Sequence, residues 1–179
     1  MEKNTDLKIE RIPYEHYIDY SRLSDHVHSL MEHKERYVPC TGDWFDELTE
    51  ENSILMGIYD NQKLIAGFLA LVPSDEENYA NYLDNHIDLD TVIHMETAAV
   101  HENYRGQHLQ EQLMLAIEPL IFAKYPKRVN ALCTVHPENS ASLRNVEHAG
   151  YQNIAFVPNM YDNERYIYYK RLPYRKLPD

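Results

Sequence analysis

Glycine, cysteine and long apolar runs are all scarce in this sequence, and each shortage excludes a class of protein. Only 5 of the 179 residues are glycine, and we find neither a linker rich in glycine and serine nor an internal repeat that would divide the chain. Two cysteines, Cys40 and Cys133, are too few for a disulfide scaffold. No apolar run approaches the roughly 20 residues that cross a bilayer, so a membrane protein is not expected.

Positive charge is also scarce, because 17 lysines and arginines face 29 aspartates and glutamates, and the formal charge is −12. Such a surface repels phosphate backbones, so nucleic acid is not expected as a partner, whereas cationic molecules are weakly attracted. The first residues lead into no apolar stretch, so we expect no signal peptide and a cytoplasmic protein. The apolar share of 44% is ordinary, and residues 1–179 are expected to form one domain.

Hydrophobic patterning predicts an α/β chain with a mixed sheet. In the first half we expect a strand at 7–13, amphipathic helices within 15–36, a short helix at 43–49, a hairpin of strands buried on both faces at 54–59 and 64–72, and an acidic loop at 74–90. In the second half we expect a strand at 91–100, a helix from near Gly106 that Pro119 kinks or breaks, a strand at 129–135, a helix from Asn139 to Gly150, and a hairpin at about 151–158 and 165–171.

The segment from Val100 to Gln110 is the most informative for function. A buried strand ends, a polar turn follows and an amphipathic helix begins. The first N–H groups of a helix lack internal partners and lie at the positive end of its dipole, so they suit a diphosphate. Gly106 lets the backbone approach such a ligand, and Arg105 offers a charge-assisted contact. An ordinary strand-to-helix connection with an exposed arginine would explain the same spacing.

This segment resembles the cofactor motif of the GNAT superfamily of N-acetyltransferases. The positions that fit the motif are Val100, Tyr104, Arg105, Gly106 and Leu109. His108 and Gln110 stand where the family usually has small residues. The stretch from Asn139 to Tyr151 is similar to a later motif of the family, and the resemblance covers roughly residues 52–158. It implies a single GNAT-like domain whose mixed, mostly antiparallel central sheet is flanked by helices.

The resemblance also implies acetyl-coenzyme A as the cofactor. In the family the pantetheine arm lies along the strand that here ends at Val100, and this strand splays from its neighbour after Val129, leaving a gap for the thioester. The cofactor-binding residues implied by the two motifs are Ala98, Ala99, Val100, Arg105, Gly106, Gln107, His108, Leu109, Gln110, Asn139 and Ser142. Asn139 could equally serve only as a helix cap.

Direct transfer to a neutral primary amine, of a small molecule or a peptide, needs a base. Strand residues two apart share a face, so we expect one face to carry His94, Glu96, Ala98 and Val100, and a core face to carry Ile93, Met95, Thr97 and Ala99. The basic carboxylate of some family members maps to His94, whose unperturbed pKa is about 6.5. Glu96 is the second candidate, and it could instead orient His94 or bind a cationic substrate. Both groups could also be incidental on a partly solvated face.

The family often protonates the departing thiolate with a tyrosine, and Val146 stands at that position here. Tyr151, Tyr161 or water could take this role. This loss, together with the departures at His108 and Gln110, modestly favours the alternative of a non-catalytic coenzyme A-binding sensor or regulatory domain. A protein-interaction domain without a cofactor is a third class. The sequence leaves a homodimer open.

Two further groups of reactive residues are expected to be structural. Cys133 lies in a predicted strand and is interpreted as a small buried residue rather than a nucleophile. His26 and His33 would share a helix face while His28 would not, and no carboxylate completes a convincing ligand set. The sequence therefore predicts no metal site.

Overall fold

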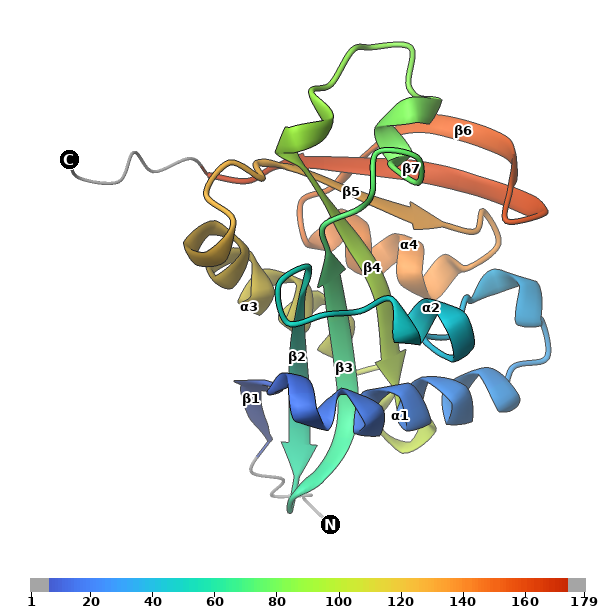
Figure 1. Ribbon diagram of the computed structural model, residues 1–179. Coiled ribbons are helices and arrows are strands. Elements are labelled where there is room, and N and C mark those ends of the chain that lie inside the picture. Colours follow the sequence, from blue (N-terminus) through green and yellow to red (C-terminus); the bar gives the residue numbers. More distant parts are fainter. Residues whose placement is uncertain (1–6, 174–179) are drawn as a thin grey trace.

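A twisted sheet with helices on both faces forms the body of the molecule in the computed structural model, which describes residues 7–173 (Figure 1). The strands are β1 (Lys8–Arg11), β2 (Ser53–Asp60), β3 (Lys63–Leu71), β4 (Val92–Val100), β5 (Asn130–Val135), β6 (Gln152–Met160) and β7 (Asn163–Arg171). The helices are α1 (Tyr17–Ser29), α2 (Gly42–Asp46), α3 (Leu109–Lys124) and α4 (Ser140–His148), with 3-10 turns at 14–16, 34–36, 79–82, 89–91 and 102–104.

The sheet is mixed and mostly antiparallel, as the resemblance implies. Its order is β1-β2-β3-β4-β5-β7-β6, and every neighbouring pair is antiparallel except β4 and β5. The two halves of the sheet therefore meet at a parallel pair, which is the point where the chain crosses over through α3.

The β2–β3 hairpin is buried on both faces, which confirms the interpretation of its two continuous apolar runs. Met56 and Phe68 belong to the cluster that packs under α3, whereas Leu55 and Leu69 belong to the cluster that packs under α1. In Figure 1, α1 crosses one face of the sheet, and α3 and α4 cover the other. This alternation places a core on each side of β3.

Helix α3 begins later than predicted, and Pro119 lies inside it without a break. It begins at Leu109 rather than near Gly106, because Gly106 (φ 77°) and His108 (φ 56°) both have left-handed backbone that a helix cannot continue. Pro119 does not end the helix, which continues to Lys124. The carbonyl that a proline leaves unpaired belongs to the residue four positions earlier, here Leu115, which is 44% exposed, so water can bond to it.

Strand β4 contains a bulge that changes which of its residues share a face. Met95 pairs with Ala70 and Ala98 pairs with Phe68, so Glu96 and Thr97 together oppose a single residue of β3. After the bulge, Ala98 packs with the same cluster as Met95, and the phenol of Tyr20 donates to the Thr97 carbonyl oxygen at 2.7 Å.

The bulge overturns one prediction about β4. Regular alternation would put Ala98 and Val100 on the face of His94, but both pack with the α3-side cluster that contains Ile93. Ala99 packs instead on the α1 side. The expected shared face is therefore wrong beyond Glu96, because the extra residue in the strand reverses the pleat.

The residues described, 7–173, include no helix that is both long enough and apolar enough to pass through a membrane.

Candidate active site

A gap opens between β4 and β5 in the middle of the sheet. The two strands pair only from Val92 to His94, opposite Asn130 to Leu132, so they separate after Leu132 rather than after Val129 as expected. A cavity of about 490 Å³ occupies the gap. Its walls are the separated strands, at Met95–Ala98 and Cys133–Val135, with side chains of α3, α4, the 73–82 segment and the β6–β7 turn around them.

The turn before α3 is open to solvent and rich in backbone donors. In the part of the chain that the structure describes, the Gln112 N–H is the first after Arg105 to bond to a backbone carbonyl, that of His108 at 3.0 Å. A Cβ added at Gly106 would meet nothing within 4 Å, so a ligand can approach the backbone there. The Arg105 side chain is exposed and forms no ion pair with any residue in 7–173. These features suit a diphosphate.

The remaining residues of the predicted cofactor motif divide into buried and exposed positions. Leu109 is 4% exposed and its side chain packs in the core, so only its backbone can face a ligand. Gln107 and His108 are exposed, and the Gln107 carbonyl accepts from the Gln112 side chain at 3.1 Å. Ala98 lines the cavity, whereas the Ala99 side chain is fully buried against the α1-side cluster.

The two motifs meet where α3 and α4 lie side by side. Gln110 Oε1 accepts from the Ser142 hydroxyl at 3.4 Å and from the Asn145 amide at 3.3 Å, so this departure from the family pattern connects the two helices. Asn139 Oδ1 accepts from the Ser142 N–H at 3.2 Å, which confirms the helix-capping role. Gln110, Asn139 and Ser142 all line the cavity, as does the buried Val146.

His94 and Glu96 form a hydrogen-bonded pair at the other side of the gap. The Tyr79 N–H donates to His94 Nε2 at 3.1 Å, so the ring proton lies on Nδ1, which is 2.9 Å from Glu96 Oε1 and donates to it. The His94 ring is 2% exposed and stacks on the Tyr79 ring with centroids 3.6 Å apart. His94 thus has no free basic nitrogen, whereas the Glu96 carboxylate lines the cavity.

Two phenols extend this pair into a chain. The Tyr79 hydroxyl lies 3.1 Å from both Glu96 oxygens and donates to the carboxylate, and the Tyr161 hydroxyl donates to the Tyr79 oxygen at 2.9 Å. Burial raises the pKa of Tyr79 and of Tyr161, so both phenols are protonated donors at neutral pH. Tyr151, the other tyrosine considered as an acid, lies in the core and bonds to Glu118 at 3.4 Å.

The cavity wall carries charges of both signs. Glu76, Glu77 and Glu96 contribute carboxylates, while Arg36 and Arg165 contribute guanidinium groups. Arg165 is 4% exposed, and it donates to the carbonyls of Glu35 and Glu164 at 2.8 Å each. Burial lowers the pKa of Arg165. A cationic group of an acceptor would meet the carboxylates, and an anionic group would meet the arginines.

Cys133 lies in the wall of the gap but is buried at 3% exposure. Burial raises the pKa of its thiol, so the thiol is protonated at neutral pH and cannot act as a thiolate nucleophile. This agrees with its interpretation as a small buried strand residue.

Sequence reasoning missed Tyr79, Arg165 and the bulge. Tyr79 lies 15 residues before His94, inside a segment predicted only as an acidic loop, and Arg165 lies 130 residues from the Glu35 carbonyl that it contacts. Contacts between residues so far apart in the sequence cannot be predicted from the periodicity of a single strand or helix. A bulge likewise leaves no mark in a run of alternating residues.

A sequence model described as the Acetyltransferase (GNAT) family matches residues 14–151, which is more than half of the chain. The chain belongs to the GNAT family of acetyltransferases. General acetyl transfer is the activity that this membership supports. No curated protein matches the sequence.

Solved structures of low sequence identity share the fold across almost the whole chain. An acetyltransferase from Salmonella typhimurium, solved with its cofactor acetyl-CoA, is 12% identical with a TM-score of 0.68, and 97% of this chain and 98% of that chain are covered. NAA60 from Arabidopsis thaliana, in complex with a bisubstrate analogue, is 13% identical with a TM-score of 0.68 and coverage of 94% and 99%. An N-acetyltransferase from Staphylococcus aureus is 16% identical with a TM-score of 0.66 and coverage of 93% and 97%.

Proposed function

We propose that this chain transfers the acetyl group of acetyl-coenzyme A to a primary amine of a small molecule or peptide, with Glu96 as the base. One observation carries this proposal: the cavity between β4 and β5 has a carboxylate in its wall and reaches residues Gln110 and Ser142 at the junction of α3 and α4. We therefore expect the thioester of the donor and the amine of the acceptor to meet in this cavity beside Glu96.

The binding of coenzyme A is proposed at the head of α3. The backbone amides between Arg105 and Gln110 would hold the pyrophosphate, together with the exposed Arg105 side chain, which forms no ion pair within residues 7–173. The backbone of Ala98 to Val100 would pair with the pantetheine arm, and Asn139 and Ser142 would line its far side. When bound, the cofactor supplies an acetyl thioester to the gap.

The base is assigned to Glu96 rather than His94. The basic nitrogen of His94 already accepts the Tyr79 N–H, and its Nδ1–H donates to Glu96, so His94 positions the carboxylate. Glu96 lies on the bulge of β4, and its side chain is 12% exposed, so it reaches the cavity without full solvation. It would take a proton from the ammonium of the acceptor, directly or through one water, and leave the neutral amine that attack requires.

Transfer joins the amine nitrogen to the acetyl carbon, and the carbon–sulfur bond breaks. The thiolate that leaves needs a proton, and Tyr161, one of the tyrosines that line the cavity, is the proposed donor, at a position unlike that of the family tyrosine. Its hydroxyl is joined to Glu96 through Tyr79, and both hydroxyls now donate toward Glu96. If both hydroxyls rotate, protonated Glu96 would donate to Tyr79, Tyr79 to Tyr161 and Tyr161 to the thiolate, so the proton taken from the amine would be returned. Water is the other donor.

Turnover of acetyl-CoA with a panel of amines tests the proposal. The panel contains polyamines, aminoglycosides, lysine, other amino acids and peptides with free N-termini, and release of the thiol is followed. Amine-dependent release by the wild-type protein that is lost in Glu96→Gln supports the enzyme. Tight binding of coenzyme A with no transfer to any amine would support the sensor instead.

A protein that does not bind coenzyme A would be neither the proposed acetyltransferase nor a coenzyme A-binding sensor. If saturating coenzyme A left the melting temperature unchanged, the chain would be an interaction domain with this fold. Ligand at 100 times its dissociation constant stabilises a folded protein by about 2.7 kcal/mol, so such binding is readily seen in a melting curve.

A further inference from the structure

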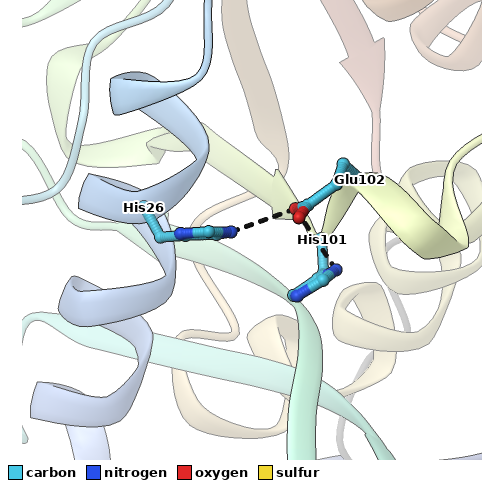
Figure 2. Close-up of side chains that lie close together, drawn as sticks. All are labelled: His26, His101 and Glu102. Carbon is cyan, nitrogen blue, oxygen red and sulfur yellow. Dashed lines mark hydrogen bonds and ion pairs between the residues drawn. The ribbon is translucent and has the colours of Figure 1, made fainter.

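We propose that His26, His101 and Glu102 bind a zinc ion that ties α1 to the end of β4. His26 belongs to the last turn of α1, His101 directly follows β4, and Glu102 begins the 3-10 turn that leads to the head of α3. Figure 2 shows the two imidazole rings and the carboxylate pointing toward one another from these separate elements. This site is independent of the acetyl-transfer cavity, since none of the three residues lines that cavity.

The three ligand atoms have the spacing of a zinc coordination shell. Glu102 Oε2 lies 3.0 Å from His26 Nε2 and 3.2 Å from His101 Nδ1. Bonds of about 2.0–2.2 Å at tetrahedral angles put neighbouring ligand atoms about 3.3 Å apart. The two nitrogens and the oxygen all lie within 4.8 Å of one another.

The hydrogen bonds of His101 are mismatched without a cation. Its Nδ1 accepts from the Asn103 N–H at 3.3 Å, so a lone pair lies on that atom, yet a Glu102 oxygen is only 3.2 Å away. The same nitrogen cannot accept a proton from one group and donate a proton to the other. A metal ion would bind both the lone pair and the carboxylate, and the exposed Asn103 N–H could then bond to water.

The surroundings suit a structural site with one solvent ligand. The His101 side chain is 11% exposed, whereas those of His26 and Glu102 are 44% and 37% exposed, so water can take a fourth position. A hollow of about 340 Å³ adjoins the two histidines, and the charge of Arg22 in its wall is offset by Asp19 at 3.5 Å. Lys63 also lines the hollow, and within residues 7–173 its ammonium group forms no ion pair.

A second group of similar composition is less suited to a metal. His108 and His148 lie 3.4 and 3.6 Å from Glu111 Oε2, and their side chains are 62% and 55% exposed. Because both histidines of this group are more than half exposed, more side-chain ordering is needed before a metal is bound. This group therefore provides a matched control within the same chain.

Calorimetric titration of ZnCl2 into the full chain, stripped of metal with a chelator and without coenzyme A, tests the proposal. We expect one saturable site per chain and a rise in melting temperature with zinc alone. Co²⁺ in place of Zn²⁺ should give the visible absorption of a tetrahedral site. His26→Ala and Glu102→Gln should each weaken zinc binding at least tenfold, because each removes one of three protein ligands.

Two controls separate this site from adventitious histidine binding. His28→Ala removes a histidine from the same helix, and His148→Ala removes one from the second group; both should keep the wild-type zinc affinity. Melting curves without zinc show whether each variant folds. The proposal is overturned if wild-type protein binds no zinc saturably, if His26→Ala keeps wild-type affinity, or if His148→Ala abolishes the site.

Discussion

The two ends of the proposed active site differ in how they are built. At the head of α3, the donors come from consecutive residues between Arg105 and Gln110, of which residues 105–108 are exposed. At the bulge of β4, the carboxylate of Glu96 is held by His94 and by phenols from two other segments, and most of this group is buried. The comparison teaches that binding a diphosphate needs a local backbone conformation, whereas placing a base needs the assembled fold.

The largest expected effect is on the base. Glu96→Gln keeps the size and hydrogen-bonding shape of the side chain but cannot take a proton, so kcat should fall by about 10²–10⁴-fold. The dissociation constant of coenzyme A should change less than about twofold, because Glu96 is not among the residues proposed to hold the pyrophosphate or the pantetheine arm. Steady-state kinetics and calorimetry measure the two quantities separately.

The exposed Glu32 provides the control for that change. Glu32→Gln removes the same charge from a position that lines neither the cavity nor the turn, and kcat should be unchanged. If Glu96→Gln kept the wild-type kcat with a good acceptor, the assignment of Glu96 as the base would be wrong.

The second effect concerns the binding end. Arg105→Glu places a negative charge beside the exposed amides and should weaken coenzyme A binding about tenfold or more, which corresponds to ~1.4 kcal/mol. kcat at saturating acetyl-CoA should stay near the wild-type value. Lys127→Glu, which reverses an exposed charge beyond the far end of α3, is the matched control and should leave the affinity unchanged. Equal weakening by both variants would indicate general charge repulsion instead.

The third effect tests whether the conformation of the β4 bulge depends on its hydrogen bond to the buried Tyr20. Tyr20→Phe removes the hydrogen bond to the Thr97 carbonyl, a bond of 2.7 Å between buried groups, and leaves that oxygen unpaired. The free energy of unfolding should fall by about 1–3 kcal/mol. kcat should also fall several-fold, because Thr97 is the neighbour of Glu96 on the bulge.

Tyr14→Phe serves as the comparison for Tyr20. It also removes a bond from a phenol to a carbonyl, to Leu48 at 2.9 Å, but far from the bulge along the chain. Chemical denaturation should show a loss of stability while kcat stays unchanged. A loss of kcat in Tyr14→Phe equal to that in Tyr20→Phe would mean that general destabilisation explains both.

The smallest effect is on the pH dependence of stability. Burial raises the pKa of Tyr79 and of Tyr161, so above pH 10 the unfolded chain loses these protons while the folded chain keeps them. Stability should therefore fall as pH rises beyond about 10, by at most about 1.4 kcal/mol per pH unit for each tyrosine. Urea unfolding at several alkaline pH values should show a shallower decline for Tyr161→Phe than for the wild type. An identical decline would contradict the raised pKa of the Tyr161 phenol.

Much of the fold could be predicted from the sequence because its signals are local. The continuous apolar runs of β2 and β3, the Asn139 cap and Gly150 at φ 91° after α4 all reflect interactions between near neighbours. Helix α3 was placed correctly but started too early, because a left-handed non-glycine residue such as His108 is not visible as a helix boundary.

The candidate site could be predicted only where neighbouring residues build it. The turn from Arg105 to Gln110 was found from consecutive residues, and His94 and Glu96 were found from their strand. The sequence did not show which of His94 and Glu96 would be the base. That assignment depends on the Tyr79 N–H, which donates to His94 from a segment that the sequence pattern predicts only as a loop. The same reason hid the approach of Glu102 to His26, two residues 76 positions apart.

The position of the sulfur atom in a crystal structure of the coenzyme A complex tests the central claim most directly. We predict that the sulfur lies in the gap between Met95–Ala98 and Cys133–Val135, within reach of Glu96 through at most one water, and that the pyrophosphate lies against Gly106 to Gln110. A complex in which coenzyme A is bound firmly but its sulfur lies outside this gap would contradict the account.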